Sequence, residues 1–182
     1  STILEQTEKL DFLIQSLVKL SRMESGIIAV HSEDTTIKQM LESIQQQFNV
    51  KVREKNITLS LCDTDLHVCC DSKWTVEALG NIVDNAIKYT ACGGNVQIKV
   101  EQYSFFVKID IIDDGIGIEK EEIPKIFGRF YRSLSVADQP GVGIGLFLAR
   151  EIIQAQKGYI KVTSKRGKGS TFSVFLPIAK KE

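Results

Sequence analysis

The sequence predicts an α/β (α+β) fold, a two-layer sandwich in which helices cover one face of a mixed, largely antiparallel sheet. Segments with an apolar residue at every second position occur in adjacent pairs, which is typical of antiparallel strands with one covered face. Other segments carry apolar residues three and four positions apart and predict amphipathic helices. With 182 residues, of which 43% are hydrophobic, the chain is long enough for one main core.

The first predicted element is a helix from Ile3 to about Met23, whose leucines and isoleucines recur at helical spacing. Ser25 and Gly26 end it, because glycine takes the left-handed conformation that often follows a helix. The apolar stripe of this helix needs a partner, which is either the body of the protein or a second copy of the chain.

The remaining elements follow in chain order, separated by turn-forming residues. Asp71 or Ser72 caps the helix that begins near Lys73, because a short polar side chain there accepts a hydrogen bond from the first turn. The residues from Arg129 to Gly141 show no sustained period and predict a loop. We expect strands at 27–30, 57–61, 67–70, 95–102, 105–113, 159–165 and 170–177, and helices at about 36–55, 73–89, 121–127 and 144–156.

The composition excludes several classes of function. Acidic and basic residues balance at 23 each, so no net charge favours nucleic acid or an anionic membrane. No apolar run approaches the ~20 residues that cross a bilayer, and no cleavable leader is present, so we expect the given chain to be soluble. The four cysteines form no Cys-x-x-Cys pair, and the two histidines lie outside zinc-like spacing, so ordinary reduced thiols of a cytosolic protein are expected.

The predicted helix at 73–89 carries Asn81, Asn85 and Lys88 on one face, since successive residues turn by about 100°. Asparagine is a mediocre helix former, so its presence there needs a reason. Carboxamide oxygens suit Mg²⁺, which shares its ligands with substrate phosphates, and a lysine offsets phosphate charge. A solvated helix face is the alternative interpretation.

Two glycine-rich stretches could bind a ligand closely. Asp113 ends a strand before Gly115 and Gly117, where a carboxylate can accept a hydrogen bond from an exocyclic amine such as that of adenine; an ordinary turn is the alternative. The glycines of "PGVGIGL" lead into a helix, whose free N–H groups favour phosphate, although a flexible connection is also possible. Leu146 breaks a dinucleotide-binding fingerprint, and Gly169 after Lys168 excludes a P-loop.

The stretch "IFGRFYRS" lies between these glycine motifs. Arg129 and Arg132 are three residues apart and can both reach toward a polyphosphate, although surface arginines are usually just solvated. Ile126, Phe127 and Phe130 are expected to anchor the stretch to the body of the protein.

In this order and spacing, these stretches resemble the ATP-binding catalytic domain of sensor histidine kinases, within the superfamily of DNA gyrase, the Hsp90 chaperones and MutL. "NIVDNAIKYT" is similar to the family's N box, "DDGIGI" to its first glycine box, "IFGRFYRS" to its F box, "GVGIGL" to its second glycine box and "GKGSTF" to its last. The resemblance covers about Ile27 to Pro177. It implies a Bergerat-type sandwich in which ATP lies between the N-box helix and a mobile lid from about Ser133 to Pro140.

The resemblance also implies a role for each matching residue. Asn85 would coordinate Mg²⁺, and Asn81 would support the metal through water or polarise it. Asp113 would accept the adenine amine. The other implied contacts are Lys88 and Tyr89 at phosphate or ribose, Gly115 and Gly117 at the base, Gly141, Gly143 and Gly145 around the phosphates, Arg129 or Arg132 at the γ-phosphate, Thr171 near the base, and Ile118, Phe130 and Leu146 in the pocket.

The N-terminal helix looks like the second helix of the family's dimerisation and phosphoacceptor hairpin, so residues 1–26 would be its remnant and 27–182 the catalytic domain. Neither His31 nor His67 has the acceptor-box context, and both are expected to be structural. The resemblance implies the cytoplasmic part of a membrane-anchored bacterial receptor that forms a homodimer. Such a kinase transfers the γ-phosphoryl group of Mg·ATP to a histidine on a separate helix, in cis or trans, for relay to a response regulator.

Two other functions stay open. An ATPase of the gyrase or chaperone type needs a glutamate to activate water, but Asn81 stands at the expected position and Glu77 lies one turn earlier. A non-catalytic module that binds nucleotide or docks to another kinase is the second alternative, and the intact glycine boxes argue against it. Because "SLSVADQP" has no basic residue, we also expect weak phosphate clamping by the open lid and similar affinities for ADP and ATP.

Overall fold

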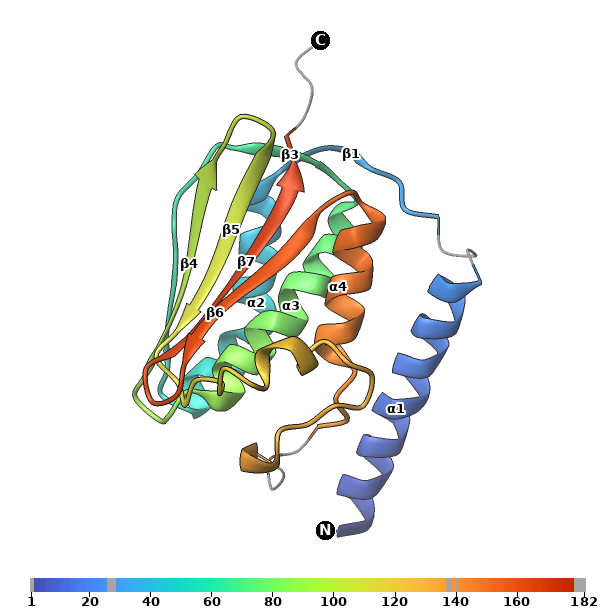
Figure 1. Ribbon diagram of the computed structural model, residues 1–182, viewed down its shortest axis with the longest axis vertical. Coiled ribbons are helices and arrows are strands. Elements are labelled where there is room, and N and C mark those ends of the chain that lie inside the picture. Colours follow the sequence, from blue (N-terminus) through green and yellow to red (C-terminus); the bar gives the residue numbers. More distant parts are fainter. Residues whose placement is uncertain (1, 26–28, 137–138, 140, 179–182) are drawn as a thin grey trace.

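The computed structural model describes residues 2–25, 29–136, 139 and 141–178. A five-stranded sheet forms one layer and three helices cover one of its faces, which confirms the predicted sandwich (Figure 1). The first two strands of the sheet are parallel and its other neighbours are antiparallel. In spatial order the strands are β2 (Thr58–Leu61), β4 (Asn95–Gln102), β5 (Phe106–Asp113), β7 (Gly169–Pro177) and β6 (Tyr159–Lys165).

The helix layer consists of α2 (Ile37–Glu54), α3 (Ser72–Tyr89) and α4 (Gly145–Ala155). The helix α3 lies between the other two and packs on the sheet (Figure 1). Asp71 is its N-cap, since the Asp71 carboxylate accepts a hydrogen bond from the N–H of Trp74 at 3.2 Å. Each fully buried aliphatic side chain in this layer contributes about 1.5–3 kcal/mol. The most deeply buried include Ile44, Ile82, Ile87 and Ile152 of the helices, which pack against Ile109 and Ile111 of β5 in one core.

The register of β5 determines where Asp113 lies. Ile109, Ile111 and Asp113 alternate toward the helices, so the carboxylate is the last inward-facing group of its strand. Asp113 is opposite Ser170 on β7. The following turn contacts the end of α3, where the N–H of Ile116 donates to the carbonyl oxygen of Tyr89 at 3.2 Å. The sheet thereby brings an acidic side chain to the C-terminal end of α3.

Residues 29 and 30 of the predicted strand at 27–30 are not in a strand, whereas residues 27 and 28 lie outside the described residues, as do Gly26 and Pro140. Instead β1 (Glu33–Thr36) pairs antiparallel with β3 (His67–Cys70) in a small second sheet. Apolar runs guided the prediction, whereas this ladder forms between backbone groups and needs few apolar side chains.

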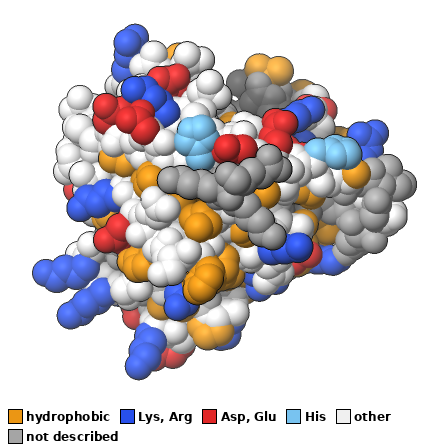
Figure 2. Space-filling view, turned by 90° about the horizontal axis from the view of Figure 1, so that it is seen from above, with side chains coloured by type: hydrophobic (Ala, Val, Ile, Leu, Met, Phe, Trp, Pro, Cys, Tyr) orange, Lys and Arg blue, Asp and Glu red, His pale blue; other side chains and the backbone are white. Residues whose placement is uncertain are grey.

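Both histidines make ordinary polar contacts at the surface, and Figure 2 shows histidine side chains beside acidic ones. His67 Nδ1 lies 2.7 Å from Asp34 Oδ1. The backbone N–H of His31 donates to Asp71 Oδ2 at 3.0 Å. The contact of His67 fits the structural role expected for it, whereas the bond at His31 involves its backbone and leaves the role of its imidazole a prediction.

The N-terminal helix α1 (Thr2–Glu24) lies beside α4, away from the sheet (Figure 1). Leu20 is buried against Ile144 and Phe147, and the Lys19 ammonium lies 2.7 Å from the Glu77 carboxylate of α3. The body of the protein therefore covers part of the predicted stripe. Its exposed apolar residues include Ile3, Leu4, Leu10, Phe12, Ile14, Leu17 and Val18.

The chain between β5 and α4 crosses one end of the helix layer (Figure 1). Instead of the predicted helix at 121–127, it forms a 3₁₀ helix at Ile123–Lys125, where Pro124 removes a backbone donor. A second 3₁₀ helix spans Leu134–Val136, in the part of the predicted lid that the structure describes. Among the helices described, none combines the length and the apolar character that a bilayer crossing requires.

Candidate functional site

A cavity of about 650 Å³ lies between α3 and the chain that connects β5 to α4. Most of the residues singled out from the sequence line it, although they come from four separate stretches. Those that line the cavity are Asn81, Asn85, Lys88, Tyr89, Asp113, Gly117, Ile118, Arg132, Gly141, Gly143, Gly145 and Leu146. Gly115, Arg129, Phe130 and Thr171 are not among the lining residues.

Asp113 provides a buried carboxylate at one end of the cavity. Its Oδ1 accepts a hydrogen bond from the N–H of Gly115 at 2.9 Å, which gives Gly115 a supporting position. Burial raises the pKa of Asp113 above its ordinary value, while hydrogen bonds from the N–H groups of Gly115 and Ser170 act in the opposite direction. A desolvated acceptor of this kind can select a ligand that offers a matching donor.

The neighbouring Asp114 has a different environment. It is exposed, and it accepts hydrogen bonds from the backbone N–H and from Nδ2 of Asn95, both at 2.8 Å. These bonds lower the pKa of Asp114. Asp114 therefore fastens the turn, whereas Asp113 faces the cavity.

Two glycines allow backbone segments to meet around the cavity. Gly117 has φ +68°, and a Cβ there would lie 2.1 Å from the carbonyl oxygen of Lys165. Gly143 has φ +78°, and its Cβ would lie 2.6 Å from the carbonyl oxygen of Tyr131. Any side chain at either position would force the backbones apart. The glycine boxes therefore shape the walls of the cavity.

Asn81 and Asn85 lie one turn apart on α3 and both face the cavity. Asn81 Nδ2 is buried and has no hydrogen-bond partner among the described residues. An unpaired buried donor costs about 1–3 kcal/mol, so a bound phosphate or a metal-bound water at this position would satisfy it. The carboxamide oxygens of the pair are the type of ligand that Mg²⁺ accepts. These residues fit a magnesium–phosphate group.

Positive charge surrounds the same part of the cavity. Burial lowers the pKa of Lys88, nearby Arg132 and Lys51 lower it further, and Asp84 acts in the opposite direction. The Lys88 ammonium lies 4.9 Å from the centre of the Tyr89 ring. Lys51 also forms an ion pair with Asp84. A bound polyphosphate would neutralise the positive charge of these clustered side chains.

The structure distinguishes between the two arginines of "IFGRFYRS". Arg132 lines the cavity, and its Nη2 donates to the carbonyl oxygen of Val136 at 3.0 Å and to that of Gln139. The Arg129 guanidinium lies over the Phe147 ring, 4.7 Å from its centre. Arg132 is therefore the better candidate for contact with a phosphate.

Two predicted side chains do not lie where we expected. Phe130 is 55% exposed, so it does not anchor its segment, although Ile126 and Phe127 pack on the core as predicted. Thr171 lies on the sheet face opposite to the helices, because side chains alternate along β7 and its neighbour Ser170 faces inward. Ser170, and not Thr171, lines the cavity.

Sequence reasoning missed several lining residues. Tyr131 donates a hydrogen bond from its hydroxyl group to Glu122 Oε1 at 3.1 Å, and both residues line the cavity. The position of Tyr131 between two singled-out arginines was an available signal. Phe12 and Lys19 of α1 also line the cavity, but no sequence pattern indicates how α1 docks.

The chain matches the family model described as histidine kinase-, DNA gyrase B-, and HSP90-like ATPase over residues 70–180, more than half of its length. The sensor histidine kinase WalK of Bacillus subtilis is 34% identical over 177 residues, which cover 94% of this chain and 29% of WalK. The sensor protein kinase PmrB of Pseudomonas aeruginosa is 30% identical over 171 residues, which cover 93% of this chain and 36% of PmrB. The chain therefore spans about a third of the length of these relatives.

The fold is similar to that of a solved relative. The structure of the Acinetobacter baumannii histidine kinase AdeS aligns with a TM-score of 0.78 and 26% identity, covering 98% of this chain and 83% of that chain. The family match includes the stretches that line the cavity from β3 to β7. The chain belongs to the family of histidine kinase-, DNA gyrase B- and HSP90-like ATPases.

Proposed function

We propose that this chain binds Mg·ATP in the cavity beside α3 and is the catalytic part of a sensor histidine kinase. One observation carries the proposal: the buried Asp113 carboxylate and the row Asn81, Asn85 and Lys88 line the same cavity. Asp113 lies beside the end of α3, and Asn81 lies eight residues before that end. At 1.5 Å per residue this spacing is about 12 Å, a distance that an extended nucleoside triphosphate can bridge.

In this proposal each residue has a separate task. Asp113 accepts a hydrogen bond from the adenine amine, and Lys88 and Arg132 neutralise phosphate charge. Asn85 and Asn81 would hold Mg²⁺, which when bound would offset charge on the phosphates. Phosphoryl transfer depends mainly on such positioning and charge neutralisation. The glycines at 141, 143 and 145 leave backbone N–H groups accessible at the start of α4.

The phosphoryl acceptor in this proposal is a histidine on a separate helix. The bond between the γ-phosphorus and the bridging oxygen breaks, a phosphorus–nitrogen bond forms at the imidazole, and ADP leaves. The names of WalK and PmrB as sensor kinases support this reaction. The response regulator, the homodimer, the membrane anchor and the division at residue 26 stay predictions for the longer protein.

Steady ATP hydrolysis is less well supported. The gyrase-type reaction needs a glutamate that activates water, and Asn81 occupies the expected position. The nearby Glu77 carboxylate lies 2.7 Å from the Lys19 ammonium, so it is already engaged in an ion pair with α1. We therefore expect slow turnover of ATP by the isolated chain.

Calorimetric titration with Mg·ATP tests the proposal. The wild-type chain should bind saturably, and Asp113→Asn should lose most of the affinity, because an amide presents a donor where the adenine amine needs an acceptor. Asp114→Asn, the matched control, should bind like the wild type. If the folded wild-type chain does not bind Mg·ATP, the proposed function is wrong and a non-catalytic regulatory module becomes the better supported alternative.

A further inference from the structure

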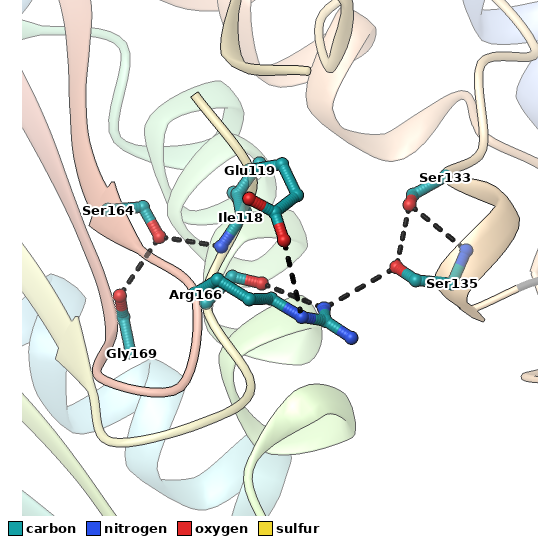
Figure 3. A network of polar contacts seen from close by, with 8 residues as sticks. Ile118, Glu119, Ser133, Ser135, Ser164, Arg166 and Gly169 are labelled. Carbon is teal, nitrogen blue, oxygen red and sulfur yellow. Dashed lines mark hydrogen bonds and ion pairs between the residues drawn. The ribbon is translucent and has the colours of Figure 1, made fainter. Parts of the chain in front are cut away.

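The turn between β6 and β7 is fastened to the loop that follows β5. The N–H of Gly167 donates to the carbonyl oxygen of Ile116 at 2.8 Å. The N–H of Ile118 donates to Ser164 Oγ at 2.8 Å, and that hydroxyl donates to the carbonyl oxygen of Gly169 at 2.9 Å (Figure 3). The turn therefore forms a stable support next to the part of the cavity that Gly117 lines.

Arg166 extends from this support toward the predicted lid (Figure 3). Its Nη1 donates to the carbonyl oxygen of Gly117 and to Ser135 Oγ, both at 3.4 Å. Its Nε lies 3.9 Å from Glu119 Oε1, and this ion pair orients the guanidinium group. Gly117 and Ser135 line the cavity, so Arg166 can act on a ligand through them.

Ser135 links Arg166 to the rest of the turn at 133–136. Its N–H donates to Ser133 Oγ at 3.2 Å, and the two hydroxyl oxygens lie 2.7 Å apart (Figure 3). From the other side, Arg132 donates to the carbonyl oxygen of Val136 at 3.0 Å. The turn at 133–136 is therefore internally braced, and a contact at Ser135 positions the whole turn.

We propose that Arg166 is a positioning residue for the nucleotide, which slows nucleotide dissociation by holding the turn at 133–136 against Gly117. The inference rests on the proposed function. The segment "SLSVADQP" has no basic residue of its own, and Arg166 supplies a cation to it from the turn between β6 and β7. The two 3.4 Å hydrogen bonds are long, so the expected effect is moderate.

Two measurements on the full chain test the proposal. Hydrogen exchange reports on the backbone amides of 134–136 in the ligand-free protein, and stopped-flow fluorescence reports the dissociation rate of a fluorescent ATP analogue. The variants are Arg166→Ala, Ser135→Ala, their double mutant and Arg166→Lys, which retains the charge. Lys168→Ala is the control, because it removes a lysine from the same turn.

Arg166→Ala and Ser135→Ala should each accelerate exchange at 134–136 and nucleotide dissociation by roughly two- to tenfold. The double mutant should be slower than the product of the two single effects predicts, because both single variants remove the same bond between Arg166 and Ser135. Arg166→Lys should recover part of the effect, and Lys168→Ala should match the wild type. Unchanged rates in Arg166→Ala, or additive effects in the double mutant, would overturn the proposal.

The two proposals fail differently. If the wild-type chain binds no nucleotide, the proposed function is wrong, and the exchange rates still decide whether Arg166 holds the turn. If the wild type binds and Arg166→Ala dissociates at the same rate, only the role of Arg166 is wrong. A melting temperature for each variant separates a positioning effect from general loss of stability.

Discussion

A side chain at Gly141 would begin 2.7 Å from the ammonium nitrogen of Lys88, so the glycine-rich loop before α4 closes directly on the lysine of α3. Gly141→Ala should therefore displace the flexible end of the lysine, and it should also strain the backbone, because Gly141 has φ +152°. We expect about tenfold weaker Mg·ATP binding in calorimetry, because a charge-assisted contact to phosphate is weakened.

Gly93→Ala is the matched control for this substitution. Gly93 also has a positive φ, +81°, but no atom lies within 4 Å of a Cβ placed there. It should lose about 1 kcal/mol of stability through backbone strain and keep its affinity for ATP. Equal affinities of Gly141→Ala and the wild type would show that Lys88 does not bind the phosphates.

The lowered pKa of Lys88 leads to a prediction about pH. In the interval between this pKa and the ordinary value of 10.5, the unfolded chain binds more protons than the folded chain, so this group makes stability rise with pH there. A bound phosphate favours the ammonium form, so ATP affinity should fall with pH across the same interval. Binding should also take up protons, which calorimetry in buffers of different ionisation enthalpy detects.

Lys55 provides the control for proton uptake. Burial lowers its pKa as well, but its Nζ donates to the carbonyl oxygens of Ile87 and Lys88, at 2.8 and 2.6 Å, and it does not line the cavity. Lys88→Gln should abolish the uptake, and Lys55→Gln should retain it. Uptake that persists in Lys88→Gln would assign the proton to another group.

Asn85→Ala and Asn81→Ala should distinguish a metal site from a solvated helix face. If the carboxamides hold Mg²⁺, Asn85→Ala should bind Mg·ATP about as weakly as the wild type binds ATP in the presence of a chelator. Asn81→Ala also removes the buried Nδ2, which has no partner among the described residues. The free energy of unfolding of the ligand-free Asn81→Ala variant should therefore change little or rise. Equal losses with and without Mg²⁺ would indicate direct contact with the nucleotide instead.

The sequence was sufficient to predict most of the fold and the polar and glycine residues of four stretches that line the cavity. Period and turn residues located α3 and β5, and helical geometry placed Asn81, Asn85 and Lys88 on one face. These features are local, because they depend on residues within a few turns of one another. The inward direction of Asp113 follows from the alternation along β5.

The features that sequence reasoning missed depend on contacts between distant segments. Thr171 and Ser170 differ by one position, and only the register with β5 decides which of them faces the helices. The strand β1 consists only of acidic residues and threonines, so no hydrophobic pattern marked it as the partner of β3. Arg129 and Arg132 could be told apart only after Phe147 was seen to lie beneath Arg129.

The docking of α1 gives the last prediction. Leu20 is 6% exposed against Ile144 and Phe147, next to the glycine-rich loop, whereas Leu17 is 46% exposed on the same helix. Leu20→Ala should reduce the free energy of docking by about 2–3 kcal/mol. Most of the stability of a helix in a protein comes from the packing of its apolar face, so the amides of α1 should exchange faster in Leu20→Ala and at the wild-type rate in Leu17→Ala.

Sedimentation velocity of the same variants tests whether the exposed stripe binds a second copy of the chain. If α1 packs only on its own body, the wild type and Leu17→Ala should sediment identically as monomers. A concentration-dependent dimer that Leu17→Ala weakens would instead assign the exposed stripe to self-association. Whatever the oligomeric state, Leu20 contacts Ile144 and Phe147 at the start of α4, next to the cavity. Leu20→Ala should therefore alter ATP affinity, whereas Leu17→Ala should not.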